Sequence, residues 1–542
     1  MAGQVLDLFY DWAGVLVPTV AIASLVTVVL RKTIFEIPPS LNFPVVHVPS
    51  NDTRDAILEG YRKYPDSPFV LPINPPRVVL PMSMFKEVVE TAEEDMSFRE
   101  LVHFMFSGHN THLGVNVDEL VSAIRIDLTK SIGALMPILQ DECKLAFDTI
   151  LKNVKEGEWS AVLAQGAALQ IVSRMSGRVF VGPELCRQPG YLRTSTMFTA
   201  DAAKVRNDLQ QYNQLLRPFA VPFLNSLKSL RGHLQDAKKW MDPITNELLP
   251  KKGERAKIVP AGSRGAWISW LLKYLPDHEK TSTKLGLLQM QVSFASLHTT
   301  TGATTNVRLD IEIFQTRTQL MFKQALLDLA TYPQFVDGLR QEIDSVLAED
   351  GEAIDENGQL YITKATIAKM KNLDSFLKES QRLTPLAFDG MSRRLHKKVT
   401  FSNGITIPKG VLLTMPIYPS HCKSQSEKNP IIGRDCAPNS APLDVFDAYR
   451  FARLREIPGN EAKYQSTATG EGQFTFGHGP NACPGRFFAL YIMKVIMIHV
   501  LRNYDLRLLP DALEDVQLVC QILLMGLFRL SSDRGREAVS LK

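Results

Sequence analysis

The stretch Phe476-Gly477-His478-Gly479-Pro480-Asn481-Ala482-Cys483-Pro484-Gly485-Arg486 places one cysteine in a loop rich in glycine and proline, directly before the apolar run 487–500. Glycine allows turns and close backbone approaches that a β-carbon would obstruct. Pro484 follows the cysteine, and proline suits the first turn of a helix. We therefore expect Cys483 where a loop enters a helix, with backbone amides and the helix dipole favouring its thiolate. Such a thiolate is a nucleophile or a metal ligand.

A buried thiol without chemistry is the simpler interpretation of Cys483 taken alone, because cysteine is among the most buried residue types. The residues around it form a more specific pattern, F-x-x-G-x-x-x-C-x-G. This pattern resembles the haem-thiolate loop of the cytochrome P450 family, whose cysteine is the axial ligand of haem iron. The resemblance implies that heme b is bound by Cys483 as the metal ligand and by its loop neighbours Phe476, Gly477, Gly479, Asn481 and Gly485.

The same resemblance implies two arginines near the haem propionates, Arg125 and Arg393. The tryptophan that usually precedes the first arginine by four residues is Val121 here, and a surface arginine is the alternative. Arg394 is the neighbouring candidate for the second. The family usually has a basic residue two positions before the cysteine. Asn481 occupies this position here, so its contact with a haem propionate would be a neutral hydrogen bond.

A second pattern, E-x-x-R, is formed by Glu379 and Arg382 on a predicted helix. Positions three apart share a helix face, so the two side chains can pair, although a solvated surface pair is the default for this pattern. Downstream, FDAYRF at 446–451 resembles the family's F-x-P-x-R-F segment, with Ala448 in place of proline. The resemblance implies a buried structural network of Glu379, Arg382 and Arg450 that supports the haem loop. In the helix after the loop, Lys494 is expected to be a solvated charge.

A third pattern, ASLHTT at 295–300, lies in the long helical candidate 285–305. It resembles the family's oxygen-binding motif, usually small-Gly-x-acid-Thr-Thr. A hydroxyl within a helix can bond a carbonyl of the preceding turn and open the ladder there, so such a site can hold water. The resemblance implies a catalytic role in proton delivery for Thr299, with His298 in place of the usual acid. A threonine-rich helix face is the alternative.

The segment 307–324 interrupts the resemblance. Residues 325–343 resemble the family's next helix, which in the family usually follows the oxygen-binding helix directly. The eighteen codons of 307–324 begin with a valine codon, which starts GT, and end on a glutamine, for which CAG is a codon. We therefore hypothesise a retained intron, and the alternative is a genuine insertion. Sequencing of spliced transcripts tests this: uniform retention in active cells rejects the intron. Residues 422–436 form a second irregular stretch.

Residues 12–30 are a run of 19 without a charged side chain, enough to span about 28 Å as a helix. Asp7 and Asp11 precede the run, and Arg31 and Lys32 follow it. A signal peptide carries its positive charge before the apolar run, so a single anchor with a cytosolic remainder is favoured. A buried core helix or a signal peptide are the alternatives.

Composition narrows the class of protein. The chain has 542 residues, 45% hydrophobic and 22% charged, which is ordinary for a globular protein of one large or several smaller domains. A net charge of +4 is too small to argue for nucleic acid. Six cysteines without a C-x-x-C pair argue against a disulfide framework or zinc site, and fit a reducing compartment.

Together these motifs are similar to those of fungal, membrane-anchored cytochrome P450 enzymes of secondary metabolism, including terpenoid oxidases such as ent-kaurene oxidase-like enzymes. The implied fold is mainly α with a small β-rich region, plus an N-terminal transmembrane helix. Residues 1–36 would be the anchor and its flanks, and 37–542 the haem-thiolate monooxygenase domain. The implied location is the endoplasmic reticulum membrane, single-pass, with a cytosolic catalytic domain.

The resemblance implies oxidation of a hydrophobic, terpenoid-like metabolite with O2 and NADPH electrons. The electrons would come from NADPH–cytochrome P450 reductase, with cytochrome b5 as an optional second donor. Two alternatives remain open at this point. One is a non-oxygenating haem-thiolate isomerase, and the other is a non-catalytic product of faulty splicing, suggested by 307–324.

Overall fold

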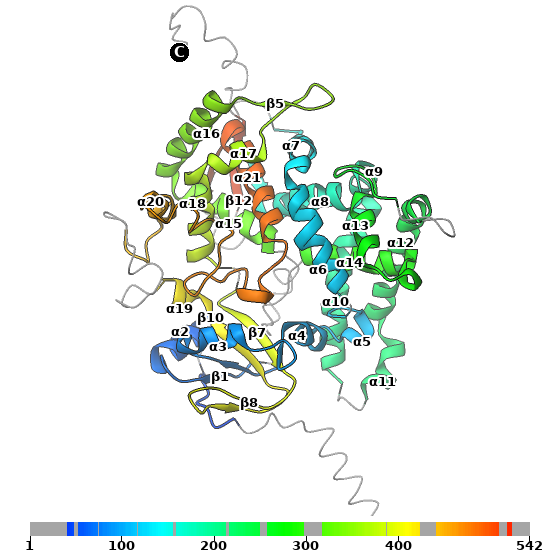
Figure 1. Ribbon diagram of the computed structural model, residues 1–542, viewed down its shortest axis with the longest axis vertical. Coiled ribbons are helices and arrows are strands. Elements are labelled where there is room, and N and C mark those ends of the chain that lie inside the picture. Colours follow the sequence, from blue (N-terminus) through cyan, green and yellow to red (C-terminus); the bar gives the residue numbers. More distant parts are fainter. Residues whose placement is uncertain are drawn as a thin grey trace, which may run out of the picture.

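The computed structural model describes residues 41–47, 53–73, 75–115, 117–154, 159–212, 216–249, 257–297, 317–385, 387–422, 441–508 and 517–522. Helices dominate these residues, and several of the short strands, including β1, β7, β8 and β10, lie together in the lower left of Figure 1. The predicted fold class, mainly α with a small β-rich region, is confirmed for the described chain. The predicted anchor, 12–30, lies outside the described residues.

The helices are α2 Thr53–Lys63, α3 Phe85–Glu90, α4 Phe98–Met105, α5 Gly108–Thr111, α6 Asp118–Ser122, α7 Thr129–Ile150, α8 Ala164–Phe180, α9 Pro183–Cys186, α10 Pro189–Gln210, α11 Arg217–Ala220, α12 Asn225–Leu248, α13 Ala266–Tyr274, α14 Ser282–Leu297, α15 Arg317–Thr331, α16 Val336–Asp350, α17 Lys364–Lys369, α18 Lys371–Leu383, α19 Ile417–Cys422, α20 Arg450–Glu456 and α21 Arg486–Asn503. Among the described residues, none of these helices combines the length and apolar character needed to cross a bilayer.

A five-stranded sheet forms the lower end of the molecule in Figure 1. Its strand order is β1-β2-β10-β7-β3, with β10 parallel to β2 and antiparallel to β7. The strands are β1 Phe69–Leu71, β2 Arg77–Val79, β3 Met96–Ser97, β7 Asp389–Leu395 and β10 Leu412–Pro416.

Three smaller sheets complete the β structure of the described residues. One contains β4 Ser160–Leu163, β11 Tyr504–Leu508 and β12 Gln517–Ile522, and another pairs β5 Ala353–Ile354 with β6 Leu360–Tyr361. In the third, β8 Val399–Thr400 pairs with β9 Thr406–Ile407 around Gly404, whose φ is +81°. Gly404 supplies the positive φ that the turn between these two strands requires.

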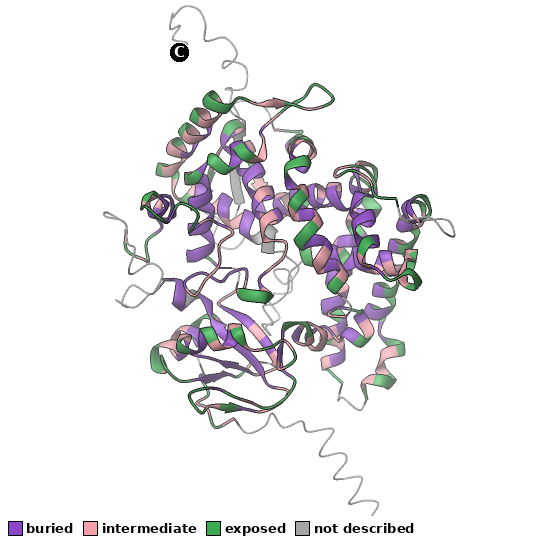
Figure 2. Ribbon diagram, in the orientation of Figure 1, coloured by how far each residue is buried: buried purple, intermediate pink, exposed green. Residues whose placement is uncertain are grey.

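The core lies where α7, α8, α15, α18 and α21 pack together, and Figure 2 shows buried residues concentrated at the centre of the molecule. α21 is apolar on all sides, which is typical of a helix that runs through a core. α18 is buried along residues 373–382, including its charged side chains. These two helices therefore carry the charged groups that need partners inside the protein.

α14 ends at Leu297 and α15 begins at Arg317, so 298–316 lies outside the described residues. The last eight residues of the segment 307–324 are the first two turns of α15. Within them Met321 is 3% exposed and Phe322 is fully buried. This part of the segment therefore contributes side chains to the core.

Candidate functional site

The loop before α21 folds back so that Cys483 lies beside Phe476. The backbone N–H of Cys483 donates to the carbonyl of Phe476 at 2.8 Å, and that of Gly477 donates to Phe474 at 2.8 Å. Between them, a 3-10 turn, η7, spans Gly479–Asn481. The side chain of Cys483 is half-buried. The backbone therefore fixes where the thiol stands.

Gly477 and Gly479 make this backbone path of the loop possible, since both have a φ of +69°. A β-carbon on Gly479 would lie 2.6 Å from Val89 Cγ1, and one on Gly477 would lie 3.2 Å from the Asn481 carbonyl oxygen. Residues with a β-carbon rarely adopt this φ. The predicted need for glycine in the loop therefore has a steric cause at both positions.

Cys483 lies three residues before the start of α21, which confirms that the loop enters a helix there. Gly485 caps this helix, and the N–H of Ala489 donates to the Gly485 carbonyl at 2.9 Å. The Arg486 guanidinium donates to the Cys483 carbonyl at 2.9 Å and to Thr467 at 3.2 Å. The cysteine is thus held between the loop and the N-terminus of a buried helix, where the dipole favours a thiolate.

Arg393 is a buried cation on β7 with no carboxylate partner among the described residues. Its side chain is 4% exposed, donates only to the adjacent Ser392 carbonyl at 2.8 Å, and lies 5.8 Å from the centre of the Phe98 ring. Burial lowers the pKa of this guanidinium to about 10, although Glu93 acts in the opposite direction. The neighbouring Arg394 pairs with Glu100 at 2.5 Å. An anionic group such as a haem propionate would compensate the buried charge of Arg393.

Arg125 lies against the cysteine loop. It stands on a π-helical segment, η2 Ala123–Leu128, and donates to the Pro480 carbonyl at 3.3 Å. π-Helical turns occur frequently at functional sites. Pro480 precedes Asn481, which is half-buried in the same loop. Arg125, Asn481 and Cys483 therefore share one region, and Ile124 lies beneath Gly485.

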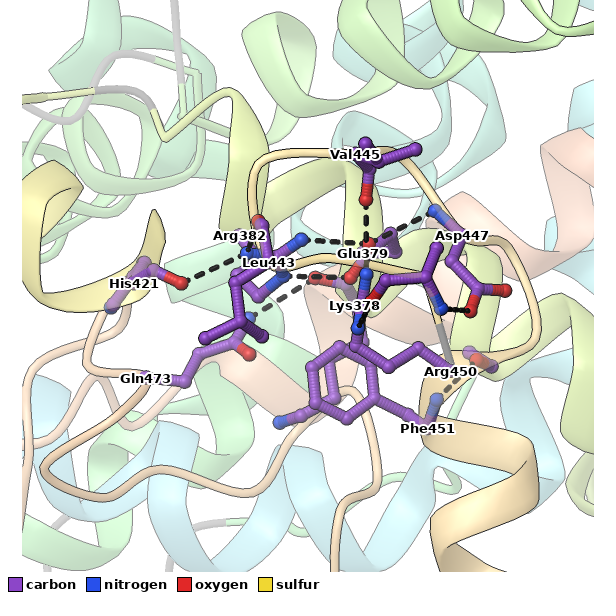
Figure 3. A network of polar contacts seen from close by, with 12 residues as sticks. Lys378, Glu379, Arg382, His421, Leu443, Val445, Asp447, Arg450, Phe451 and Gln473 are labelled. Atoms are coloured by element: carbon purple, nitrogen blue, oxygen red, sulfur yellow. Dashed lines mark hydrogen bonds and ion pairs between the residues drawn. The ribbon is translucent and has the colours of Figure 1, made fainter. Parts of the chain in front are cut away.

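Glu379, Arg382 and Arg450 lie together inside the protein (Figure 3). Arg382 meets Glu379 through two parallel hydrogen bonds of 2.8 Å, and Arg450 Nε lies 3.1 Å from Glu379 Oε1. The three side chains are at most 1% exposed. A carboxylate between two guanidiniums compensates charges that would be very costly to bury alone.

The remaining N–H groups of Arg382 and Arg450 donate to backbone carbonyls of other segments. Arg382 donates to the carbonyls of His421 at 2.9 Å and Leu443 at 2.6 Å. Arg450 donates to three carbonyls between 2.7 and 3.0 Å, those of Ala441, Pro442 and Val445. The network therefore ties α18 to α19, to α20 and to the segment that precedes α20.

His421 and Lys378, to which the sequence reasoning gave no role, connect this network to the cysteine loop. His421 Nε2 accepts from the N–H of Phe474 at 3.2 Å, two residues before Phe476. Gln473 donates to the Lys378 carbonyl at 3.2 Å, and Lys378 Nζ donates to the carbonyls of Gln465 and Ala468 at 2.9 and 3.0 Å. Burial lowers the pKa of Lys378 to about 8, despite the opposing charge of Asp374.

Lys494 is buried, so the expectation of a solvated charge is wrong. It lies 7% exposed on α21 and contacts Asp374 of α18 at 2.5 Å. Asp374 also meets Arg455 of α20 at 3.2 Å and accepts from Ser466. Burial raises the pKa of Asp374, but Lys494 and the Ser466 hydrogen bonds lower it more. The signal was present in the sequence: a single lysine in a helix apolar on all sides needs a buried partner.

Thr299 and His298 lie outside the described residues. The structure describes only the beginning of their motif, at the end of α14. There Ala295 is exposed, and the buried Ser296 hydroxyl has no hydrogen-bond partner among the described residues. Of the predicted residues it therefore brings together Glu379, Arg382 and Arg450, and separately Arg125 with the loop around Cys483. Arg393 stands apart from both groups on β7.

Comparisons with known proteins bear on the family of the chain. The family model "Cytochrome P450" matches residues 318–524. The chain is 36% identical to cytochrome P450 monooxygenase 3 of Gibberella fujikuroi, with 87% of this chain and 85% of that protein covered. It is 34% identical to cytochrome P450 monooxygenase ascG of Acremonium egyptiacum, with coverages of 87% and 86%.

Among solved structures, the fold is similar to that of retinoic acid-bound cyanobacterial CYP120A1, with a TM-score of 0.58. The alignment covers 89% of this chain and 100% of that chain at 14% identity, so it bears on the fold alone.

Proposed function

The chain belongs to the cytochrome P450 family as a fungal monooxygenase, and on this premise we propose that it oxidises a C–H bond of a hydrophobic, terpenoid-type secondary metabolite with O2 and NADPH-derived electrons. The observation that carries the proposal is the loop that fixes Cys483 at the start of α21. The buried guanidinium of Arg393, without a carboxylate partner in the described chain, supports an anionic cofactor nearby.

Cys483 would ligate the haem iron, and Arg393, Arg125 and Asn481 would hold the propionates. When bound, haem supplies the activation of O2, and a thiolate ligand favours cleavage of the O–O bond. The protein's own contribution is to keep the thiolate in place. The hydrogen bond from the Cys483 N–H to the Phe476 carbonyl serves this purpose. The hydrogen bond from the Phe474 N–H to His421 supports the same loop from the buried network.

Thr299 would hold a water molecule through its Oγ1 and keep a proton available at that hydroxyl, and His298, the preceding residue, would assist it. The Thr299→Ala variant should keep oxidising NADPH while forming several-fold less product per NADPH. Product and NADPH are measured in one reaction with purified reductase. Thr331→Ala, at the exposed end of α15, is the matched control and should leave this ratio unchanged. An unchanged ratio in Thr299→Ala rejects the role.

NADPH–cytochrome P450 reductase is the proposed electron donor, with cytochrome b5 as an optional second donor. The proposed location is the endoplasmic reticulum membrane, with residues 12–30 as a single anchor. Large apolar side chains around α11 and the 3-10 turn η3 Val221–Phe223 support contact with a lipid surface. Leu216, Phe219 and Phe223 are 56%, 73% and 84% exposed.

The first test is the carbon monoxide difference spectrum of the reduced, expressed full chain. We expect the Soret shift of a thiolate-ligated haem, its loss in Cys483→Ala, and its retention in Cys143→Ala, which removes a buried thiol from α7. A wild-type spectrum without the thiolate signature rejects the proposed site. Full turnover without NADPH and reductase would instead favour a non-oxygenating rearrangement.

A further inference from the structure

Arg206 is a cation on α10 without a partner in the described part of the chain. The neighbouring side chains of Ala202, Val205 and Leu209 are buried, and Arg206 itself is half-buried. Its Nε is enclosed by protein and has no hydrogen-bond acceptor. Arg382 and Arg450 differ from Arg206 in this respect, because both contact the carboxylate of Glu379.

The surroundings of Arg206 add positive charge instead of compensating it. Burial and, to a smaller extent, the charge of Arg77 on β2 together lower the pKa of Arg206 to about 10. Arg77 contacts Asp389 at 2.7 Å, and the same carboxylate oxygen accepts from Thr414 at 2.9 Å. The nearby carboxylate is therefore already in use, while Arg77 Nε also lacks an acceptor. The Asp389 carboxylate therefore pairs with Arg77, and no described carboxylate contacts Arg206.

The elements around Arg206 also contact or carry residues of the proposed oxidation site. α10 packs against α14, the helix whose end carries the motif of Thr299. Asp389 begins β7, the strand that carries Arg393 four residues later. Arg206 retains solvent contact despite its enclosed Nε, so a small group can reach the guanidinium.

We propose that Arg206 binds a carboxylate of the substrate, which makes the substrate class an apolar organic acid. A planar guanidinium forms paired hydrogen bonds with a carboxylate, and this geometry adds strength and orientation. A partly desolvated cation beside a second cation is costly until an anion arrives, so the gain on binding is large. The inference rests on the proposed monooxygenase function and specifies its substrate.

The test compares acids with their methyl esters on the full-length holoenzyme. The probes are abietate and dodecanoate, each against its methyl ester, with dissociation constants from equilibrium dialysis and from the substrate-induced Soret shift. We expect the wild type to bind at least one acid tenfold or more tightly than its ester. Arg206→Gln should abolish this preference, and Arg206→Lys should keep part of it. Arg193→Gln, at an exposed position of α10, is the matched control and should keep it fully.

Each outcome decides the proposal. Equal affinity for acid and ester in the wild type, including binding of neither, overturns it, as does a preference that survives in Arg206→Gln. Loss of haem from Arg206→Gln would mean that Arg206 serves a haem propionate, and also overturns it. The reduced carbon monoxide spectrum of the wild type separates the two proposals, because a normal thiolate signature without acid preference rejects only the inference about Arg206.

Discussion

At the scale of single residues, His421 shows how burial selects a protonation state. The ring is fully buried, its Nε2 accepts from the Phe474 N–H, and its Nδ1 has no hydrogen-bond partner in the described part of the chain. Burial, followed by the charges of Arg382 and Lys378, lowers the pKa of His421 to about 3. A neutral imidazole is therefore the form that can accept the Phe474 N–H and hold the loop that leads to Cys483.

This state predicts a dependence of stability on pH. Unfolded His421 titrates near its ordinary pKa of about 6.5, so below this pH the unfolded chain binds a proton that the folded chain rejects. The contribution is fully present above that pH and is lost as the pH falls towards the folded value of about 3. Between pH 7 and pH 5 the loss should be about 2 kcal/mol.

The measurement is urea unfolding of wild type and His421→Gln at both pH values. Glutamine can still accept the Phe474 N–H but does not titrate, so the variant should lose about 2 kcal/mol less than wild type between pH 7 and 5. His47→Gln, at an exposed position, is the control and should follow the wild type. Equal pH slopes in His421→Gln and wild type would contradict the assignment.

At the scale of secondary-structure elements, the charged side chains of α18 determine how the helices around the cysteine loop fit together. Glu379 accepts from Arg382 of its own helix, from Arg450 of α20 and from the Asp447 backbone. Asp374, one and a half turns earlier, joins α20 and α21 through Arg455 and Lys494. One helix therefore holds two carboxylates, each neutralised by two cations.

Removing the charge of Glu379 should be severe. Glu379→Gln leaves two buried guanidiniums without their anion, and the expected loss in the free energy of unfolding is about 3–5 kcal/mol. Urea unfolding monitored by circular dichroism measures the loss, and haem content per chain shows whether the loop is affected. Glu59→Gln removes a carboxylate from the solvent-exposed contacts of α2 and should change neither quantity. A loss no larger than that of Glu59→Gln would refute a supporting role for the network.

Sequence patterns predicted parts of this network and missed others for identifiable reasons. Glu379 and Arg382 follow from a spacing of three on one helix, and Arg450 follows from the resemblance of its segment. The sequence did not predict buried positions for Asp374, Lys378 and Lys494, because a charged residue is expected on the surface unless a partner is known. Their partners come from segments distant in sequence, such as Ser466 and Arg455, and only the fold brings these together.

At the scale of the whole molecule, α14 and α15 are the two described helices on either side of the segment that contains 307–316. α14 packs on α8, α10 and α12, and α15 packs on α8, α18 and α21, so the two helices belong to the same core. Arg317 begins α15, and the family model matches from residue 318 onward. The residues from 317 therefore belong structurally to the core, whereas 307–316 lie outside the described chain.

This arrangement predicts different results for two deletions. Removal of 307–324 also removes Met321 and Phe322, which are 3% and 0% exposed, and loss of two large core side chains should cost about 5 kcal/mol or more. Removal of 307–316 keeps both side chains and should preserve the melting temperature. Both variants are compared with the full chain by thermal unfolding and by the thiolate spectrum. If the longer deletion is the more stable and carries more haem, 317–324 is dispensable and the whole of 307–324 is an insertion. The opposite ranking assigns 317–324 to the enzyme and moves the boundary of any retained intron to before Arg317.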